Sequence, residues 1–240
     1  MNYKDLSSVG ENIQAQNGNW TFKGQTAKNF NQHVNRSIPY YTQGHDLIVK
    51  LSDYFIKSDS KAYDLGVSTG ELLSKLATHH HKSVQWIGID CEADMLNQAK
   101  DTLQAYDNIN LNQANICLEK FEPCDMQISY YTMQFIAPRY RQELFNKIYK
   151  SLNWGGAFVL FEKVRGPDAR FQDIFTGLYT DYKLEQGYGA DEIINKSRSL
   201  KGVLEPFSEQ GNLDLLRRAG FTDISCVFRY LCFAGFVAIK

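Results

Sequence analysis

Tyr63-Asp64-Leu65-Gly66-Val67-Ser68-Thr69-Gly70 predicts a short strand, a glycine turn and the start of a helix. A second segment, Ile87-Gly88-Ile89-Asp90, predicts an apolar strand that ends in a carboxylate. A backbone that turns at glycine can approach a ligand closely, and the ligand then lies at a helix N-terminus. A carboxylate about 20 residues further on, at the tip of the next parallel strand, can bind both ribose hydroxyls. The two segments therefore predict a nucleoside site on an open α/β sheet.

Composition narrows the class of protein. The 240 residues are 43% apolar, which is ample for a globular core in one large domain or two small ones. The net charge of −1 and the absence of a Lys/Arg run do not favour direct nucleic-acid binding or an acidic membrane surface. No apolar run approaches the roughly 20 residues that span a bilayer, and the polar N-terminus has no signal region, so we expect no membrane location. Five scattered cysteines without a CxxC pair favour a reducing cytoplasm.

Strands and helices alternate along the middle of the chain. Strands are expected at 62–65, 84–90, 109–116, 125–131 and 156–163, and helices at 70–78, 93–106 and 138–152. This alternation predicts an α/β fold with a mostly parallel sheet and helices on both faces. Two further strands, at 221–229 and 231–239, bring the sheet to seven and predict an antiparallel hairpin at its C-terminal edge.

The ends of the alternating region are expected to serve the site. We treat residues 1–240 as a single domain, in which residues 1–57 form an N-terminal lid with helices at 26–36 and 44–57. Residues 1–25 show little pattern of regular structure, although Trp20 and Phe22 could close the lid. Residues 165–210 are expected to form a helical insertion before the last two strands, because apolar residues recur there at helical spacing.

The glycine loop excludes some nucleotide sites. Its glycines are four apart, which does not match G-x-G-x-x-G, and it lacks the Lys-Ser/Thr of a P-loop. The pattern D-L-G-x-S-x-G instead resembles the glycine motif of class I S-adenosylmethionine-dependent methyltransferases, which have a Rossmann-like fold. In that resemblance Asp90 binds the ribose, Cys91 lies beside the adenine, and Asn115-Ile116 meet the adenine edge.

The resemblance extends over nearly the whole chain, from about Trp20 to Lys240. Short motifs recur in order, and they are Asn19-Trp20-Thr21-Phe22, Arg36-Ser37-Ile38-Pro39-Tyr40-Tyr41, Thr132-Met133-Gln134-Phe135, Lys147-Ile148-Tyr149, Leu152-Asn153-Trp154-Gly155-Gly156-Ala157, Glu162-Lys163, Asp181-Tyr182-Lys183 and Phe236-Val237-Ala238-Ile239-Lys240. This ordered set is similar to the carboxy-S-adenosylmethionine synthase family. Its members use prephenate to convert S-adenosylmethionine into its carboxylated form for tRNA wobble-uridine modification, and they are homodimers.

The resemblance implies S-adenosylmethionine, or its carboxylated form, as the cofactor. The residues expected to bind it are Tyr41, Asp64, Gly66, Val67, Ser68, Gly70, Asp90, Cys91, Asn115, Ile116 and Tyr130. Tyr130 and Tyr131 end the fourth strand, where the sulfonium methyl should lie, and Arg198 could bind a carboxylate, so these three are the expected catalytic residues. No metal site is expected, because the consecutive residues His79-His80-His81 cannot share one helix face.

Three positions depart from the family pattern. Asn115 stands where the synthase has aspartate, and Tyr130 where it has asparagine. The family arginine that pairs with the added carboxylate aligns to Ser197, and Arg198 is one position later, which is a rotation of about 100° on a helix. Because a buried unpaired carboxylate is costly, this shift argues against the synthase reaction itself.

The sequence therefore leaves several functions open. Methyl transfer from S-adenosylmethionine to a small-molecule acceptor is the leading hypothesis, since aligning the acceptor with an already activated methyl group is the main requirement. Carboxy-S-adenosylmethionine synthesis is the alternative. A third possibility is rearrangement of S-adenosylmethionine by attack of its own amine, and a fourth is a module that only binds the cofactor. A homodimer is expected from the resemblance alone.

Overall fold

The computed structural model describes residues 6–80 and 82–240. Residues 1–5 of the expected N-terminal lid, and His81, lie outside the described residues. The strands are β1 (Ser7–Ser8), β2 (Gln14–Ala15), β3 (Lys61–Leu65), β4 (Gln85–Asp90), β5 (Ile109–Gln113), β6 (Cys124–Tyr130), β7 (Leu152–Lys163), β8 (Asp223–Tyr230) and β9 (Phe233–Ile239). The α-helices are α1 (Gln25–Lys28), α2 (Phe30–Ser37), α3 (Tyr41–Ser52), α4 (Glu71–His79), α5 (Ala93–Leu103), α6 (Pro138–Ser151), α7 (Ala169–Glu185), α8 (Ala190–Ser199) and α9 (Glu209–Ala219).

Seven strands form one sheet in the order β5-β4-β3-β6-β7-β9-β8. The pairs from β5 to β7 are parallel, and β9 runs antiparallel to both β7 and β8. From β3 at the centre, the chain adds β4 and β5 on one side and then crosses to add β6 and β7 on the other. The adjacent strands β3 and β6 therefore flank the switch point where open α/β sheets bind ligands. The prediction of a mostly parallel seven-stranded sheet with an antiparallel C-terminal strand is confirmed.

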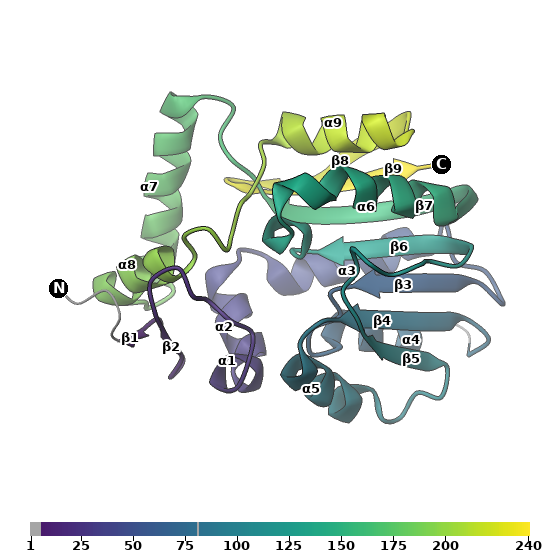
Figure 1. Cartoon of the computed structure of the whole chain (residues 1–240), viewed down its shortest axis with the longest axis horizontal. Coiled ribbons are helices and arrows are strands. Elements are labelled where there is room, and N and C mark those ends of the chain that lie inside the picture. The colour runs from purple at the N-terminus through teal and green to yellow at the C-terminus, as the bar shows by residue number, and fades with distance from the viewer. Residues whose placement is uncertain (1–5, 81) are drawn as a thin grey trace.

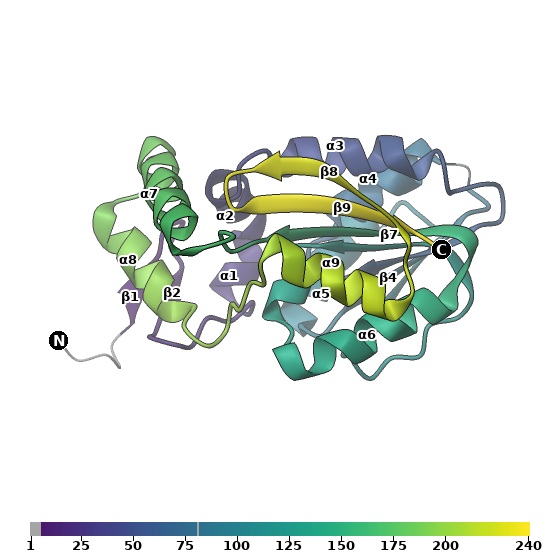
Figure 2. The same cartoon turned by 90° about the horizontal axis from the view of Figure 1, so that it is seen from above.

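Two hydrophobic layers cover the sheet. On one face α3, α4 and α5 pack against it, with Ile48, Leu73 and Trp86 among the fully buried side chains. On the other face α6 and α9 enclose Phe145 and Phe158. Figure 2 shows α3 and α4 on one side of the sheet, with α6 and α9 on the other. The helices therefore leave only the strand ends open to a ligand. No helix in residues 6–80 and 82–240 is long and apolar enough to cross a membrane.

A cap stands beyond the carboxyl ends of the parallel strands, and we define it as residues 6–38 together with α7 and α8 (Figure 1). The expectation of little regular structure in residues 1–25 is wrong for the described part of that range, since β1 and β2 pair as an antiparallel hairpin. Val9, Ile13 and Trp20 are buried beneath this hairpin, and α8 contacts both of its strands. The hairpin exists because its few apolar residues have α8 to pack against, which is a contact that local sequence patterns do not show.

Two further boundaries differ from prediction. The single helix expected at 26–36 is divided at Asn29 into α1 and α2. The helix expected at 44–57 begins earlier, at Tyr41, directly after Tyr40 in a left-handed conformation (φ 57°). The earlier start matters because it brings Tyr41 to the end of the sheet.

The segment that carries α7 and α8 leaves and rejoins the fold at one point. Arg165, just after β7, pairs with Ser208, just before α9, in an isolated parallel bridge. The backbone N–H of Arg165 donates a 2.9 Å hydrogen bond to the carbonyl of Phe207. The expected helical insertion at 165–210 therefore corresponds to a segment that carries two helices and whose two ends are held together at the sheet.

Candidate functional site

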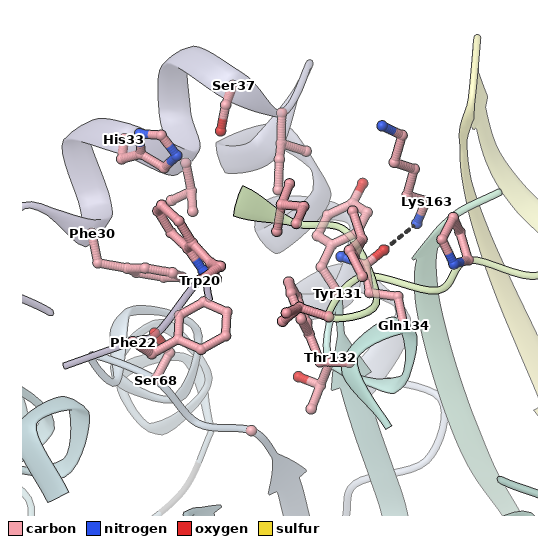
Figure 3. Close-up of a pocket in the computed structure, with 18 of the residues that line it drawn as sticks. Trp20, Phe22, Phe30, His33, Ser37, Ser68, Tyr131, Thr132, Gln134 and Lys163 are labelled. Atoms are coloured by element: carbon pink, nitrogen blue, oxygen red, sulfur yellow. Dashed lines mark hydrogen bonds between the residues drawn. The ribbon is translucent and has the colours of Figure 1, made fainter. Parts of the chain in front are cut away.

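A cavity of about 1250 Å³ lies between the strand ends and the cap. We call the part lined by the loops after β3, β4 and β5 the loop half, and the part lined by α7, α8 and the end of β7 the cap half. Figure 3 shows Trp20, Phe22 and Phe30 on one side of the cavity, facing Tyr131, Gln134 and Lys163 on the other. The cavity is large enough for a nucleoside ligand and a second small molecule.

Two acids mark the loop half. Asp64, near the end of β3, is buried, and no donor in the described part of the chain hydrogen-bonds its carboxylate. Burial, and then the charge of Asp90, raise the pKa of Asp64 to about 7. A buried carboxylate without a donor favours a positively charged ligand, because only such a group would compensate for its lost hydration. Asp64 therefore fits the ammonium or sulfonium of S-adenosylmethionine.

Asp90 lies at the tip of β4 and is held by the glycine loop. Its Oδ2 accepts a 3.0 Å hydrogen bond from the N–H of Ser68, and its Oδ1 accepts a 2.9 Å bond from the N–H of Glu92. Burial raises the pKa of Asp90, while these backbone bonds lower it. The two oxygens retain free lone pairs, which could accept the hydroxyls of a ribose.

The glycine loop leaves no room for a side chain at Gly66. Its φ is +90°, and a Cβ there would lie 2.2 Å from the hydroxyl of Thr132. Val67 and Ser68 follow on the cavity wall, and Ser68 also has a left-handed backbone (φ 52°). Gly70, in contrast, is not among the residues that line the cavity: it begins α4 with φ +81°. Its part in the motif is thus to turn the chain into the helix.

The residues expected at the adenine meet at the other end of the loop half. Cys91, Asn115 and Ile116 all line the cavity. Cys91 and Asn115 are exposed, and Ile116 is buried. The Oδ1 of Asn115 accepts a 2.9 Å hydrogen bond from the N–H of Cys117, and the NH₂ of the same side chain is a further donor on a residue that lines the cavity.

The tyrosines lie where β6 meets the cap. The rings of Tyr41 and Tyr130 are 5.0 Å apart, and that of Tyr131 is 4.7 Å from Tyr130. The Tyr130 hydroxyl donates a 2.6 Å bond to the carbonyl of Tyr41, which satisfies it within the protein. Tyr131 has a left-handed backbone (φ 60°), which is unusual for a bulky residue and places its ring beside the cavity.

The two hydroxyls therefore differ. No hydrogen bond to the Tyr131 hydroxyl is formed by residues 6–80 and 82–240, whereas the Tyr130 hydroxyl is already used. Burial raises the pKa of both tyrosines, so both stay protonated. Tyr131 can thus donate to a ligand, and the aromatic wall can attract a sulfonium through cation–π contact.

Cations gather in the cap half. Lys196, Ser197 and Arg198, all near the end of α8, line the cavity, and the Lys196 ammonium lies over the ring of Trp20. Lys163, from the end of β7, and Lys183, from α7, line it as well. No carboxylate in the described part of the chain forms an ion pair with any of these three lysines. Burial lowers the pKa of each lysine, that of Lys183 to about 8.

A buried acid joins the parts of the cap. Glu11, in the hairpin turn, accepts hydrogen bonds from His33 and Arg36 of α2 and from Tyr188, which precedes α8. The Trp20 ring stacks on His33, with centroids 5.6 Å apart. Glu11 therefore connects the hairpin and α2 to the start of α8, the helix that carries Lys196 and Arg198.

Arg36 and Glu162, which belong to the recurring motifs, and the histidines at the end of α4 make contacts within the protein and lie outside the cavity lining. Arg36 binds Glu11 and the carbonyl of Gln186, and it is not among the residues that line the cavity. Glu162 is buried, does not line the cavity, and has the charge of Arg141 nearby. At the far end of α4, His79 hydrogen-bonds Asp53, and His80 bonds Ser52, with ligand atoms of Asp53, His79 and His80 within 4.8 Å of one another.

The sequence did not identify Lys163, Lys183 and Lys196 as site residues. Lys163 and Lys183 belong to the recurring family motifs, which was the available signal. Their position became evident only when the cap placed α7 and α8 over the strand ends.

A known protein family matches the middle of the chain, and known relatives match nearly all of it. A methyltransferase-domain family model matches residues 62–156, which contain the loop half. A carboxy-S-adenosyl-L-methionine synthase of Staphylococcus epidermidis is 36% identical over 222 residues, covering 92% of this chain and 97% of that protein. One of Campylobacter jejuni is 38% identical over 220 residues, with 91% and 93% covered. The chain belongs to the carboxy-S-adenosyl-L-methionine synthase family.

Solved structures show how widely this fold is used. Haemonchus contortus phosphoethanolamine N-methyltransferase 2, in complex with S-adenosyl-L-methionine, has a TM-score of 0.64 at 14% identity, over 91% of this chain. Human N-acetylserotonin methyltransferase, in complex with SAM, has a TM-score of 0.55 at 18% identity, over 89%. The chain spans 57% and 59% of their lengths. The expected class I methyltransferase fold and S-adenosylmethionine as cofactor are thereby confirmed. The protein is an S-adenosylmethionine-dependent transferase.

Proposed function

We propose that this protein forms carboxy-S-adenosylmethionine from S-adenosylmethionine and a carboxylated organic donor. The observation that carries the proposal is the cation-rich last turn of α8. Arg198 lines the cavity together with Lys196, although the family arginine aligns to Ser197. Two cationic residues of this turn therefore line the cavity, where a carboxylate on the ligand could contact them, and the one-position shift no longer weighs strongly against the reaction.

The reaction balances with prephenate as the donor. The methyl group of S-adenosylmethionine exchanges one proton for a carboxyl group. Prephenate gives up its ring carboxyl group and its hydroxyl group and becomes phenylpyruvate, and the hydroxyl leaves as water with the methyl proton. Within this proposal Asp64 and Asp90 hold the cofactor, the aromatic wall of Tyr41, Tyr130 and Tyr131 excludes water from the sulfonium, and Arg198 binds the new carboxylate.

Methyl transfer to a small-molecule acceptor is the second candidate. It is favoured by Ser197, a neutral side chain on the cavity wall at the family arginine position, and by Tyr130 in place of the family asparagine. The volume of the cavity leaves space for an acceptor beside the cofactor. A homodimer and a cytoplasmic location remain predictions that accompany either candidate.

Mass spectrometry of the products separates the candidates. The protein is incubated with S-adenosylmethionine, with and without prephenate, next to the variant Arg198→Met and the control Arg170→Met, an exposed arginine outside the cavity. We expect carboxy-S-adenosylmethionine with prephenate only, at least about 10-fold less of it with Arg198→Met, and no change with Arg170→Met. Unchanged prephenate in the presence of bound cofactor would favour methyl transfer. Release of methylthioadenosine without prephenate would instead indicate rearrangement of the cofactor.

A further inference from the structure

Two lysines of the cap half share one tyrosine. The ammonium groups of Lys163 and Lys183 each lie 4.5 Å from the ring centroid of Tyr179. Lys163 ends β7, at the sheet, whereas Lys183 and Tyr179 are one helical turn apart on α7. Both lysines line the cavity, and Figure 3 shows Lys163 on the same side as Tyr131.

This arrangement is incomplete without an anion. Neither ammonium has a hydrogen bond or an ion pair with residues 6–80 and 82–240. Burial lowers the pKa of both lysines, and the charge of Lys163 lowers that of Lys183 further. Two half-buried like charges near one ring repel each other, and the ring offsets only part of that cost. Of the carboxylates that line this half, Glu192 already accepts hydrogen bonds from Ser8 and Gly189, and Glu205 is exposed.

Contacts of Tyr179 connect the lysine pair to β9 and to α2. Tyr179 packs against Phe233 of β9, at 5.3 Å between centroids, and its hydroxyl donates a 2.7 Å bond to the carbonyl of Ser37. Tyr131 also packs against Phe233, at 5.9 Å. Phe233 thus links Tyr179 to the aromatic wall of Tyr41, Tyr130 and Tyr131, and the lysine pair lies beside Tyr179, at the α7 end of this row of rings.

We propose that Lys163 and Lys183, held by Tyr179, form a subsite that binds a carboxylate of the second substrate. The subsite would bind an organic anion. The second substrate of the enzyme is then an organic acid, whether the reaction adds a carboxyl group to the cofactor or transfers its methyl group. The identification of the second substrate as a carboxylated donor rests on the proposed function. The carboxylate of the cofactor's methionine part is the other possible source of this anion.

Binding experiments on the loaded protein distinguish the two sources. S-Adenosylhomocysteine is bound first, its affinity is measured, and prephenate, phenylacetate and succinate are then titrated by calorimetry. Lys163→Met and Lys183→Met should each weaken binding of the carboxylate probe by about 10-fold or more, because a charge-assisted contact is lost. They should leave the affinity for S-adenosylhomocysteine within about two-fold. Lys163→Arg keeps the charge and should retain most of the binding.

Controls keep the result interpretable if a variant folds poorly. Lys201→Met removes an exposed lysine of the same cavity and should change neither affinity. Tyr179→Phe keeps the ring and should retain probe binding within about three-fold, and thermal unfolding checks each variant. A parallel loss of S-adenosylhomocysteine affinity would assign the lysines to the cofactor and overturn the proposal, as would carboxylate binding that is unchanged in both methionine variants, or no binding of any probe to the wild type. Lysine-dependent binding without carboxy-S-adenosylmethionine as a product would leave the subsite standing and remove the proposed function.

Discussion

The loop half and the cap half of the cavity differ in the charge of their buried side chains and in how they are built. Asp64 and Asp90 supply carboxylates in the loop half, while Lys163, Lys183 and Lys196 supply ammonium groups in the cap half. The loop half follows from two consecutive βα units, β3-α4 and β4-α5, and from the loop after β5, whereas the cap half joins the chain's start to a distant helical segment. On our proposals, the positive sulfonium of the cofactor would meet acids in the loop half, and a negatively charged second substrate would meet bases in the cap half.

The sharpest test of this division is removal of an acid from the loop half. Asp90→Ala should weaken S-adenosylhomocysteine binding by about 100-fold, because the variant loses the ribose contacts and the anchor of the Ser68 and Glu92 N–H groups. Probe binding to the loaded protein should change little. Isothermal titration of both ligands measures this, with Asp94→Ala of α5 as a comparison outside the cavity. Equal loss of both ligands would mean that the halves are not separate.

The two halves should also respond to pH in opposite directions. Because burial raises the pKa of Asp64 to about 7, its charge is lost as pH falls below 7, and S-adenosylmethionine affinity should decline about 10-fold per pH unit there. Lys183, which is faced by Lys163 and Cys232, has its pKa lowered to about 8, so affinity for the carboxylate probe should fall as pH rises above 8. Titrations from acidic to alkaline pH check both slopes, and Asp64→Asn should flatten only the first.

The raised pKa of Asp64 also predicts that the stability of the folded protein depends on pH. The raised pKa means that folding favours the protonated form of Asp64, so its contribution to the free energy of unfolding is largest in acid and declines as pH rises from about 4 to about 7. In Asp64→Asn this decline should be absent. Thermal unfolding of the ligand-free protein across this range measures the difference.

The tyrosine wall should separate structural from ligand-facing hydroxyls. Tyr130→Phe removes the bond to the carbonyl of Tyr41 and should cost about 1 kcal/mol of stability, seen as a lower unfolding temperature by about 2–4 °C. Tyr131→Phe removes a hydroxyl that has no partner in the described chain, and should lower kcat by about 3- to 10-fold with little change in stability. The reverse pattern would exchange the two roles.

The sequence predicted the loop half better than the cap half for a physical reason. Gly66 and Asp90 belong to two consecutive βα units of adjacent strands, so their spacing along the chain carries much of the geometry. The hairpin around Glu11 and the lysine pair on Tyr179 depend on contacts between residues more than 100 positions apart or on separate elements, which periodicity does not report. Gly70 shows that a motif residue need not contact the ligand, since it turns the chain into α4 and does not line the cavity.

The bridge between Arg165 and Ser208 has an evolutionary consequence. The two ends of the intervening segment are joined at the sheet, so a change of length between α7 and α8 would not require the sheet or the cofactor loops to move. That segment carries Tyr179, Lys183 and Arg198, so we expect differences in second-substrate choice between relatives to be concentrated there. Its contacts with Ser37, Phe233 and the β1–β2 hairpin restrict which changes keep the cap in place.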